Sequence, residues 1–110
     1  DESRMSVSDA LNYLATCADD YANAVMDEAR LDELRKAIRA EFMRESDEKT
    51  IADREAFAIT RKEYREVSEE LLPDAKRQVA YHKARMKWAD ATIEVWRSQQ
   101  ANKRNAEKVR

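Results

Sequence analysis

Two side chains of the kind that perform nucleophilic catalysis occur once each in this sequence. His82 is the only histidine and Cys17 the only cysteine among 110 residues. A thiol and an imidazole catalyse acyl transfer when they are hydrogen-bonded and a third group orients the base. The two residues lie on different predicted helices, and no such constellation is visible. A packed histidine and a small buried thiol are therefore the favoured interpretation, and a Cys17–His82 pair is the alternative.

Paired acidic residues are the second chemical candidate, because carboxylates serve acid–base catalysis and metal binding. The pairs are Asp19/Asp20, Asp27/Glu28, Asp32/Glu33 and Glu69/Glu70. Basic residues alternate with them at helical spacing: Arg30, Arg35, Lys36 and Arg39. This alternation is typical of a solvated helix face with ion pairs between neighbouring turns. With one histidine, no histidine-based metal cluster can form. We expect no enzyme activity, no cofactor and no metal site.

The third candidate is the basic C-terminal segment, residues 97–110. It holds five basic residues and one acidic residue, with Gln and Asn amides between them. Cations and amides contact phosphates without sequence preference. The candidate nucleic-acid-binding residues are Arg97, Lys103, Arg104, Lys108 and Arg110. The alternative is that these cations complement the helix dipole and keep the end of the chain soluble.

The composition limits which elements can position these groups. The chain has no Gly and one Pro, which excludes the glycine-dependent dinucleotide and P-loop motifs. Charged residues make up 40% of the sequence, which is typical of long helices or coiled coils, and the regularly spaced apolar 43% argues against disorder. Residues 1–75 carry 11 basic and 20 acidic side chains, whereas residues 76–110 carry 10 and 3. This asymmetry favours electrostatic self-pairing or an anionic partner for the basic end.

The environment of the protein is indicated by two absences. One cysteine forms no internal disulfide, which fits a reducing cytosol. Neither an apolar run of membrane-spanning length nor a signal peptide is visible, so we expect a soluble, cytoplasmic protein with no membrane contact.

Hydrophobic spacing predicts a first long helix over residues 8–45, capped by Ser6 or Ser8. Its apolar stripe consists of Leu11, Leu14, Ala18, Tyr21 and Val25. After a slip in phase the stripe continues with Leu31, Leu34, Ile38 and Phe42. Thr50 is predicted to begin a short hinge helix over residues 50–59.

A second long helix is predicted over residues 61–106, with Thr60 as its N-cap. Pro73 should kink this helix without ending it, because proline removes one hydrogen bond and crowds the preceding turn. The stripe that passes through the proline consists of Tyr64, Val67, Leu71, Ala75 and Val79.

The C-terminal half of this helix is apolar on two sides. One stripe consists of His82, Met86, Ala89, Ile93 and Trp96. The other consists of Tyr81, Ala84, Trp88, Ala91 and Val95, about 140° around the helix. The first helix can cover one side, and we expect the second stripe to be an interface between protomers, since monomers rarely leave such a patch exposed. The predicted fold is a single all-α domain, an elongated, coiled-coil-like antiparallel hairpin that is homo-oligomeric.

Three stretches resemble a group of small helical phage proteins encoded near replication and recombination genes. They are Asp-Arg-Glu-Ala-Phe-Ala at residues 53–58, Glu63-Tyr64, and Ile-Glu-Val-Trp-Arg-Ser-Gln-Gln-Ala at residues 93–101. Phe57 stands where that pattern usually has Tyr. The order of elements is also similar to the UvsY-type recombination mediators of T-even phages, which form rings, bind single-stranded DNA and help load a recombinase. Their basic DNA-contacting residues do not align one to one with this chain, so no residue role is carried over.

The resemblance implies a homo-oligomeric phage protein in the bacterial host cytoplasm. With the basic segment, it favours a non-enzymatic, mediator-like accessory factor that binds single-stranded DNA, recombination proteins, or both. A recombinase or a single-strand-binding protein would then be the protein partner. The alternative is a protein–protein interaction module without DNA binding, an inhibitor or scaffold that captures a phage or host enzyme through its acidic first helix.

Overall fold

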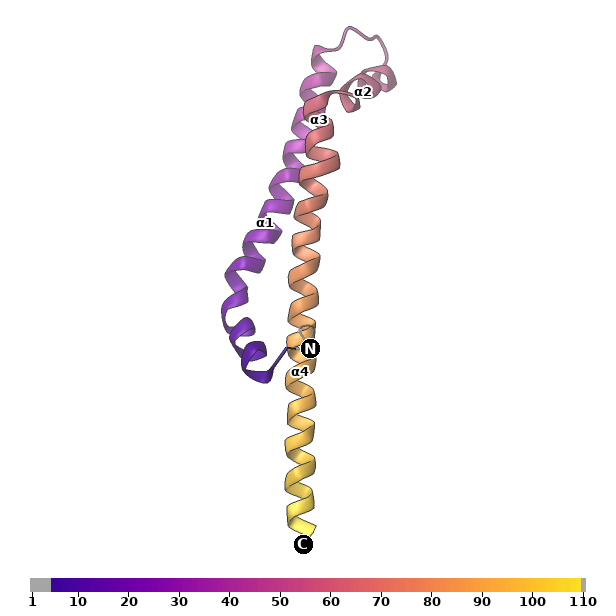
Figure 1. Ribbon diagram of the computed structural model, residues 1–110. Helices are drawn as coiled ribbons and strands as arrows, with labels where there is room; N and C mark the ends of the chain where they lie inside the picture. Colours follow the sequence, from indigo (N-terminus) through magenta and orange to yellow (C-terminus); the bar gives the residue numbers. More distant parts are fainter. Residues whose placement is uncertain (1–4, 110) are drawn as a thin grey trace. The chain divides into compact units, whose positions relative to one another are not determined.

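A computed structural model describes residues 5–109, and every regular element in that range is helical. Helix α1 comprises Val7–Glu45, α2 Ile51–Ile59 and α3 Lys62–Glu66. A π-helical segment, η1, comprises Val67–Leu71, and α4 comprises Leu72–Val109 (Figure 1). The predicted all-α class is confirmed for the described residues.

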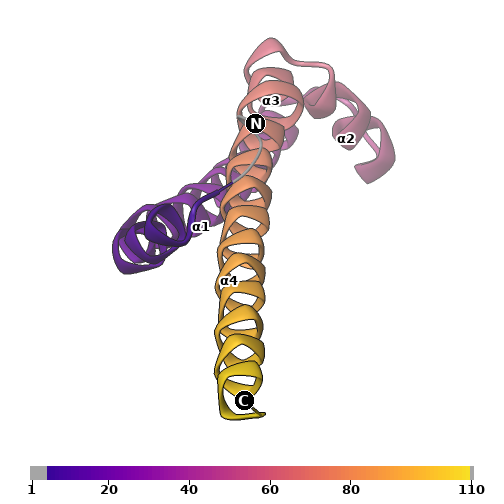
Figure 2. The ribbon, with the colours of Figure 1, turned by 60° about the horizontal axis from the view of Figure 1, so that its bottom comes forward.

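The chain divides into two compact units. The terminal unit combines residues 1–21 with residues 80–110, and the central unit consists of residues 22–79. Both α1 and α4 contribute to both units (Figure 2).

Within each unit the helices from the two halves of the chain run antiparallel. In the terminal unit, Tyr13 contacts His82, and the earlier residues 5–7 lie beside the later residues 88–99. In the central unit, Arg35 contacts Tyr64, and the later Arg39 contacts the earlier Glu55. In both cases the residue number rises along one segment as it falls along the other. The predicted antiparallel pairing therefore holds inside each unit.

The start of α1 is determined by Ser6, one of the two predicted caps. The Asp9 N–H donates to Ser6 Oγ at 3.0 Å, and the Ala10 N–H donates to the Ser6 carbonyl at 2.8 Å. These bonds satisfy N–H groups that the first helical turn leaves without partners.

Side-chain caps also organise the connection from α1 to α2. Ser46 Oγ accepts a hydrogen bond from the Glu48 N–H at 3.1 Å, and Arg54 Nε donates to the Glu48 carbonyl at 2.7 Å. Thr50 is the N-cap of α2, as predicted, and its hydroxyl accepts from the Asp53 N–H at 3.1 Å.

The predicted role of Thr60 as an N-cap is wrong. Thr60 lies in the right-handed helical region and ends α2, and its hydroxyl donates to the Phe57 carbonyl at 2.9 Å. An N-cap needs extended backbone. Arg61 provides it, with φ −73° and ψ 142°, and α3 begins at the next residue without a side-chain cap. The Arg61 guanidinium lies over the Phe57 ring, 4.2 Å from its centroid.

The single helix predicted over residues 61–106 is replaced by α3, η1 and α4, and the irregularity lies before Pro73 rather than at it. The Leu72 N–H bonds to the carbonyl of Val67, five residues back. Proline donates no hydrogen bond, and its ring crowds the carbonyl four residues earlier, that of Glu69. A wider turn directly before the proline accommodates that crowding within a continuing helix.

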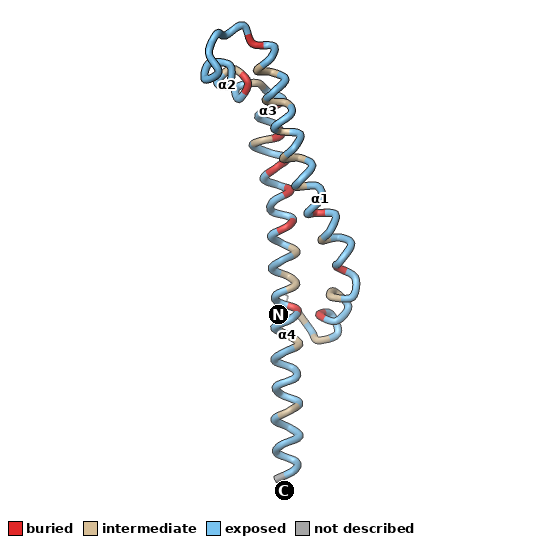
Figure 3. The backbone as a smooth tube through the Cα atoms, turned by 180° about the vertical axis from the view of Figure 1, so that it is seen from behind, coloured by how far each residue is buried: buried red, intermediate tan, exposed pale blue. Residues whose placement is uncertain are grey.

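The π-helical turn shifts the buried face by one residue. The buried residues of this segment are Tyr64, Val67, Leu72, Ala75 and Val79 (Figure 3). Leu72 therefore takes the place that the predicted stripe gave to Leu71. The step from Val67 to Leu72 is five residues, the spacing of the hydrogen bond that closes the π-turn.

The covered face of α1 also differs from the predicted stripe. Ala10, Cys17 and Ala24 are buried, whereas Leu11, Val25 and Leu34 are exposed. The buried residues follow one another at seven-residue intervals, and Leu31 and Ile38, both half-buried, continue the series without a slip in phase. The buried face of α1 therefore carries mainly small side chains, and the predicted phase, which followed the largest residues, is wrong.

Candidate functional site

The basic segment is helical as far as the structure describes it. Lys103, Arg104 and Lys108 are exposed on α4, and no ion pair involves them within residues 5–109. Arg97 is also exposed and pairs with Glu94 at 2.9 Å. Arg110 lies outside the described residues.

The helical periodicity arranges these cations in a definite pattern. Arg97, Arg104 and Lys108 are separated by seven and four residues, so they share one face of α4. Lys103 lies about 100° from Arg104 around the helix. A nucleic-acid backbone that runs along this face can contact Arg97, Arg104 and Lys108 in succession. Lys103 lies to one side of that path.

Trp96 lies next to this basic face and is exposed, although it belongs to the stripe that the first helix was expected to cover. The exposed fractions are 39% for Trp88 and 43% for Trp96. A shallow surface depression brings the Trp96 indole together with Arg97, Gln100 and Arg104. An accessible indole flanked by cations and an amide is an arrangement on which a nucleic-acid base can stack while phosphates meet the cations.

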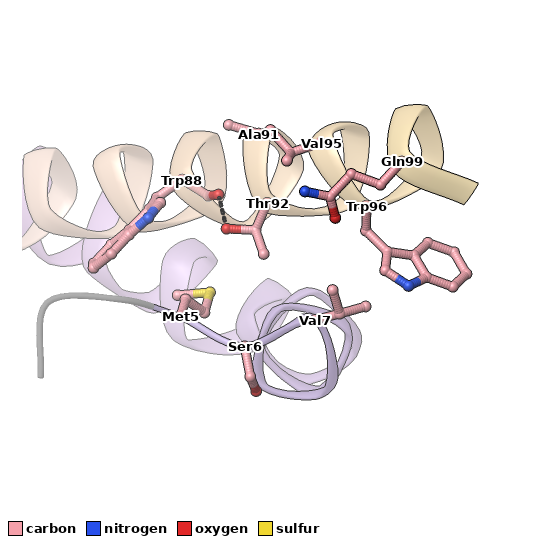
Figure 4. A pocket seen from close by; sticks show the side chains of 9 residues that line it. All are labelled: Met5, Ser6, Val7, Trp88, Ala91, Thr92, Val95, Trp96 and Gln99. Atoms are coloured by element: carbon pink, nitrogen blue, oxygen red, sulfur yellow. Dashed lines mark hydrogen bonds between the residues drawn. The ribbon is translucent and has the colours of Figure 1, made fainter. Parts of the chain in front are cut away.

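Trp96 also lines an apolar groove in the terminal unit, between Met5–Val7 and α4 (Figure 4). Gln99 is the last α4 residue that lines this groove. Beyond Ala101, every α4 residue whose burial is described is exposed (Figure 3). One sequence feature indicates this site, namely that Trp96 at the end of the apolar stripe is directly followed by Arg97.

The two apolar stripes of α4 have different surroundings in the terminal unit. Ala89 is fully buried, and His82, Met86 and Ile93 are half-buried. The other stripe, which we call the outer face, is exposed at each of its residues, Tyr81, Ala84, Trp88, Ala91 and Val95. The structure thus distinguishes the covered stripe from the open one.

His82 is bound to a tyrosine and not to the cysteine. The Tyr13 hydroxyl lies 3.1 Å from His82 Nδ1, and the Arg85 guanidinium lies over the Tyr13 ring, 5.0 Å from its centroid. Burial raises the pKa of the Tyr13 hydroxyl. Cys17 is buried with a free thiol whose nearest polar partner is the Leu14 carbonyl, at 3.9 Å. The structure therefore does not bring Cys17 and His82 together as a hydrogen-bonded pair.

Members of three of the four acidic pairs form short-range ion pairs along the helix surfaces. Asp32 Oδ1 lies 2.9 Å from Arg35 Nη2, and its Oδ2 lies 3.3 Å from Lys36 Nζ. These contacts, that with Arg35 first, lower the pKa of the Asp32 carboxyl. Asp27 pairs with Arg30 in the same way, and Arg65 pairs with Glu69 at 3.3 Å.

Residues 5–109 meet the requirements of neither a metal site nor a membrane-spanning helix. No three His, Cys, Asp or Glu side chains are grouped so that they could hold a metal ion. None of the described helices combines the length and the apolar character needed to cross a membrane.

Comparison of the chain with protein-family models, with curated proteins and with solved structures finds no match.

Proposed function

We propose that this protein is a non-enzymatic accessory factor that binds single-stranded DNA along the C-terminal part of α4. Arg97, Lys103, Arg104 and Lys108 would contact phosphates, and the Trp96 indole would stack on a base. The observation that carries the proposal is the accessible indole of Trp96 among Arg97, Gln100 and Arg104.

The charge of the segment supports this proposal because packing does not account for it. Lys103, Arg104 and Lys108 are exposed and lie beyond the last α4 residue that lines the groove with α1. Their cations are therefore available to release counterions from a phosphate backbone, the main source of affinity for nucleic acid. Base stacking on Trp96 would add an interaction that every base can make.

Several copies acting together would strengthen the binding. A segment with four described cations binds weakly alone, but linked copies on one strand raise the effective concentration of each contact. Self-association through the outer face would provide such linkage. The resemblance to phage recombination proteins is the support for a mediator-like role, in which the same assembly also contacts a recombinase or a single-strand-binding protein.

The test is the binding of a fluorescently labelled oligothymidylate, followed by anisotropy at about 50 and about 200 mM salt. Affinity should fall steeply between the two concentrations. Arg104→Ala/Lys108→Ala should weaken binding at low salt at least about tenfold and reduce the salt slope by about two, one for each lost phosphate contact. Trp96→Ala should weaken binding relative to the parent protein at both salt concentrations, because it removes the stacking surface. Trp96→Phe should retain much of the stacking.

The matched control removes the same charge elsewhere. Lys49 and Lys62 are exposed in the central unit, and Lys49→Ala/Lys62→Ala should bind DNA as the parent protein does. Equal losses in the two double variants would show that only net charge matters and would refute the assignment to α4. No salt-sensitive binding by the parent protein at about 50 mM would refute DNA binding altogether.

A protein–protein interaction module is the second candidate, favoured by the acidic excess of 20 acidic over 11 basic residues before residue 76. Exposed carboxylates along α1, such as Asp19 and Asp20, suit a basic partner. This reading predicts no oligonucleotide binding at low salt. It also predicts that the protein no longer binds a purified basic partner when Asp19 and Asp20 are changed to Asn.

A further inference from the structure

We propose that a second copy of this chain packs antiparallel on the outer face of α4, centred between Ala89 and Asp90. The inference rests on the self-association in the proposed function but not on DNA binding. It specifies the occupant, direction and register of an apolar face that the structure leaves exposed at Tyr81, Trp88 and Val95, to 53%, 39% and 57%.

The outer face alternates large and small side chains at seven-residue intervals. The large residues are Tyr81, Trp88 and Val95, and the small ones are Ala84 and Ala91. Ser98 continues the series of small residues beyond the outer face. In a parallel pair of helices, equivalent residues share a layer, so Trp88 would meet the partner's Trp88 while Ala91 met the partner's Ala91. Such layers are in turn overfilled and underfilled, and both conditions are unfavourable.

An antiparallel pair places each large residue opposite a small one. When Trp88 lies opposite the partner's Ala91, Val95 lies opposite the partner's Ala84. Tyr81 then lies opposite the partner's Ser98. By symmetry each contact occurs twice, and every layer has one large and one small member. This register fills the interface evenly.

The charges that border the outer face match the same register. Lys87 precedes Trp88, Glu94 follows Ala91 by three residues, and both side chains are exposed. In the antiparallel register Lys87 lies beside the partner's Glu94, and the pair occurs twice. In a parallel pair the corresponding neighbours of Lys87 and Glu94 are the partner's Thr92 and the partner's Gln99, which carry no charge. In the free chain Glu94 pairs with Arg97, and Lys87 has no ion pair within residues 5–109.

The basic segments give an independent argument for the direction. A parallel dimer would hold two copies of Arg97, Lys103, Arg104 and Lys108 side by side, where like charges repel. In the antiparallel dimer each Arg104 lies about 22 Å along the helix axis from the symmetry centre, in opposite directions. The separation of the two segments exceeds a Debye length at physiological salt, so their repulsion is screened.

The start of α1 borders the outer face, because Trp88, Ala91 and Val95 line one groove with Met5, Ser6 and Val7. Figure 4 shows the Ala91 and Val95 side chains across α4 from Met5 and Val7. A partner α4 would approach from the side of Ala91 and Val95 and would extend the wall of this groove. Each α4 would then be covered by its own α1 on one side and by the partner's α4 on the other.

The first test measures distances between spin labels in a Cys17→Ala background. A label at Asp90→Cys lies near the symmetry centre along the helix axis, and its separation from the same label in the partner should be about 20–25 Å, because the axes lie about 8–10 Å apart and both labels project away from the contact. A label at Asn102→Cys should be about 35–40 Å from its counterpart, because both lie about 19 Å from the centre in opposite directions. A separation at Asn102 no longer than that at Asp90 would indicate a parallel dimer and overturn the proposal.

The second test exchanges the charges and follows association by sedimentation. Lys87→Glu and Glu94→Lys should each weaken self-association at least about tenfold, because each places like charges opposite one another twice. The combined variant Lys87→Glu/Glu94→Lys should restore it. Mixing the two single variants should also restore association, since one chain then offers two acids and the other two bases. Lys83→Glu is the control, because Lys83 lies about 130° around the helix from the middle of Tyr81 and Ala84 and therefore does not border the partner.

A failure of this proposal is distinguishable from a failure of the proposed function. Single variants that do not regain association on mixing, or a chain that stays monomeric at about 100 µM, would overturn the antiparallel dimer. Salt-sensitive oligonucleotide binding by that same monomer would leave the DNA-binding proposal in place. A chain that passes the spin-label and charge-exchange tests but binds no oligonucleotide would refute the DNA-binding proposal and leave the antiparallel dimer in place.

Discussion

The Tyr13 hydroxyl joins α1 to α4 through His82, lying 3.1 Å from the imidazole Nδ1 and 3.4 Å from the backbone carbonyl oxygen. The hydroxyl donates to the carbonyl, and its role toward Nδ1 depends on the imidazole tautomer. The Arg85 guanidinium covers the Tyr13 ring. The only histidine of the chain therefore has a structural partner in the terminal unit, which explains its presence without invoking catalysis.

Replacing Tyr13 with Phe should destabilise the protein by about 0.5–1.5 kcal/mol, the net contribution of one hydrogen bond, because the ring remains and only the hydroxyl is lost. The measurement is urea unfolding at neutral pH and fixed protein concentration. Tyr21→Phe is the matched control, since Tyr21 is half-buried and its hydroxyl makes no hydrogen bond in the described part of its unit. Equal effects of the two substitutions would contradict the role given to the Tyr13 hydroxyl.

The stability contributed by Tyr13 should also disappear at alkaline pH. Burial raises the pKa of its hydroxyl in the folded protein above the value in the unfolded chain, about 10. The contribution is thus fully present below pH 10 and is lost as the pH rises through the folded-state pKa, because the unfolded chain ionises first. In Tyr13→Phe this loss should be absent, so the stabilities of the two proteins should converge above about pH 10. Parallel pH profiles of unfolding free energy would argue against it.

Neighbouring leucines around the π-helical turn provide a matched pair for the register of the central unit. Leu72→Ala should cost about 2–5 kcal/mol, as expected for a buried leucine, and Leu71→Ala clearly less. The exposed fraction of Leu72 is 6%, whereas that of Leu71 is 43%. Urea unfolding of both variants checks the difference. The opposite ranking would mean that the helix is regular before Pro73 and that the originally predicted stripe is the buried one.

The two threonines that flank α2 should differ in their effect on that helix. Thr50→Ala removes the bond to the Asp53 N–H and should reduce the local stability of α2 by about 1 kcal/mol. Amide hydrogen exchange of residues 53–58 is the measurement, since the effect is local. Thr60→Ala should leave the start of α3 unchanged, because Arg61 occupies its N-cap position. Faster exchange in α3 after that substitution would restore the predicted capping role of Thr60.

Helix positions were determined largely by the sequence itself. The groups that start a helix lie within four residues of the N–H groups they satisfy, so Ser6 and Thr50 could be recognised without knowledge of the fold. The same locality explains the error at Thr60. The residues that follow it match a capping pattern, but its backbone is helical because it ends α2. The candidate cations of the C-terminal segment were likewise visible from composition.

Which face of each helix is buried was decided by tertiary structure. The large side chains of α1 predicted one phase, but the structure buries the small residues Ala10, Cys17 and Ala24 instead. One extra residue in the π-helical turn exchanged Leu71 for Leu72, a change of register that apolar spacing cannot reveal in advance. The partial burial of Trp96 likewise involves residues distant in the sequence, because it lines a groove with Met5–Val7 and remains 43% exposed.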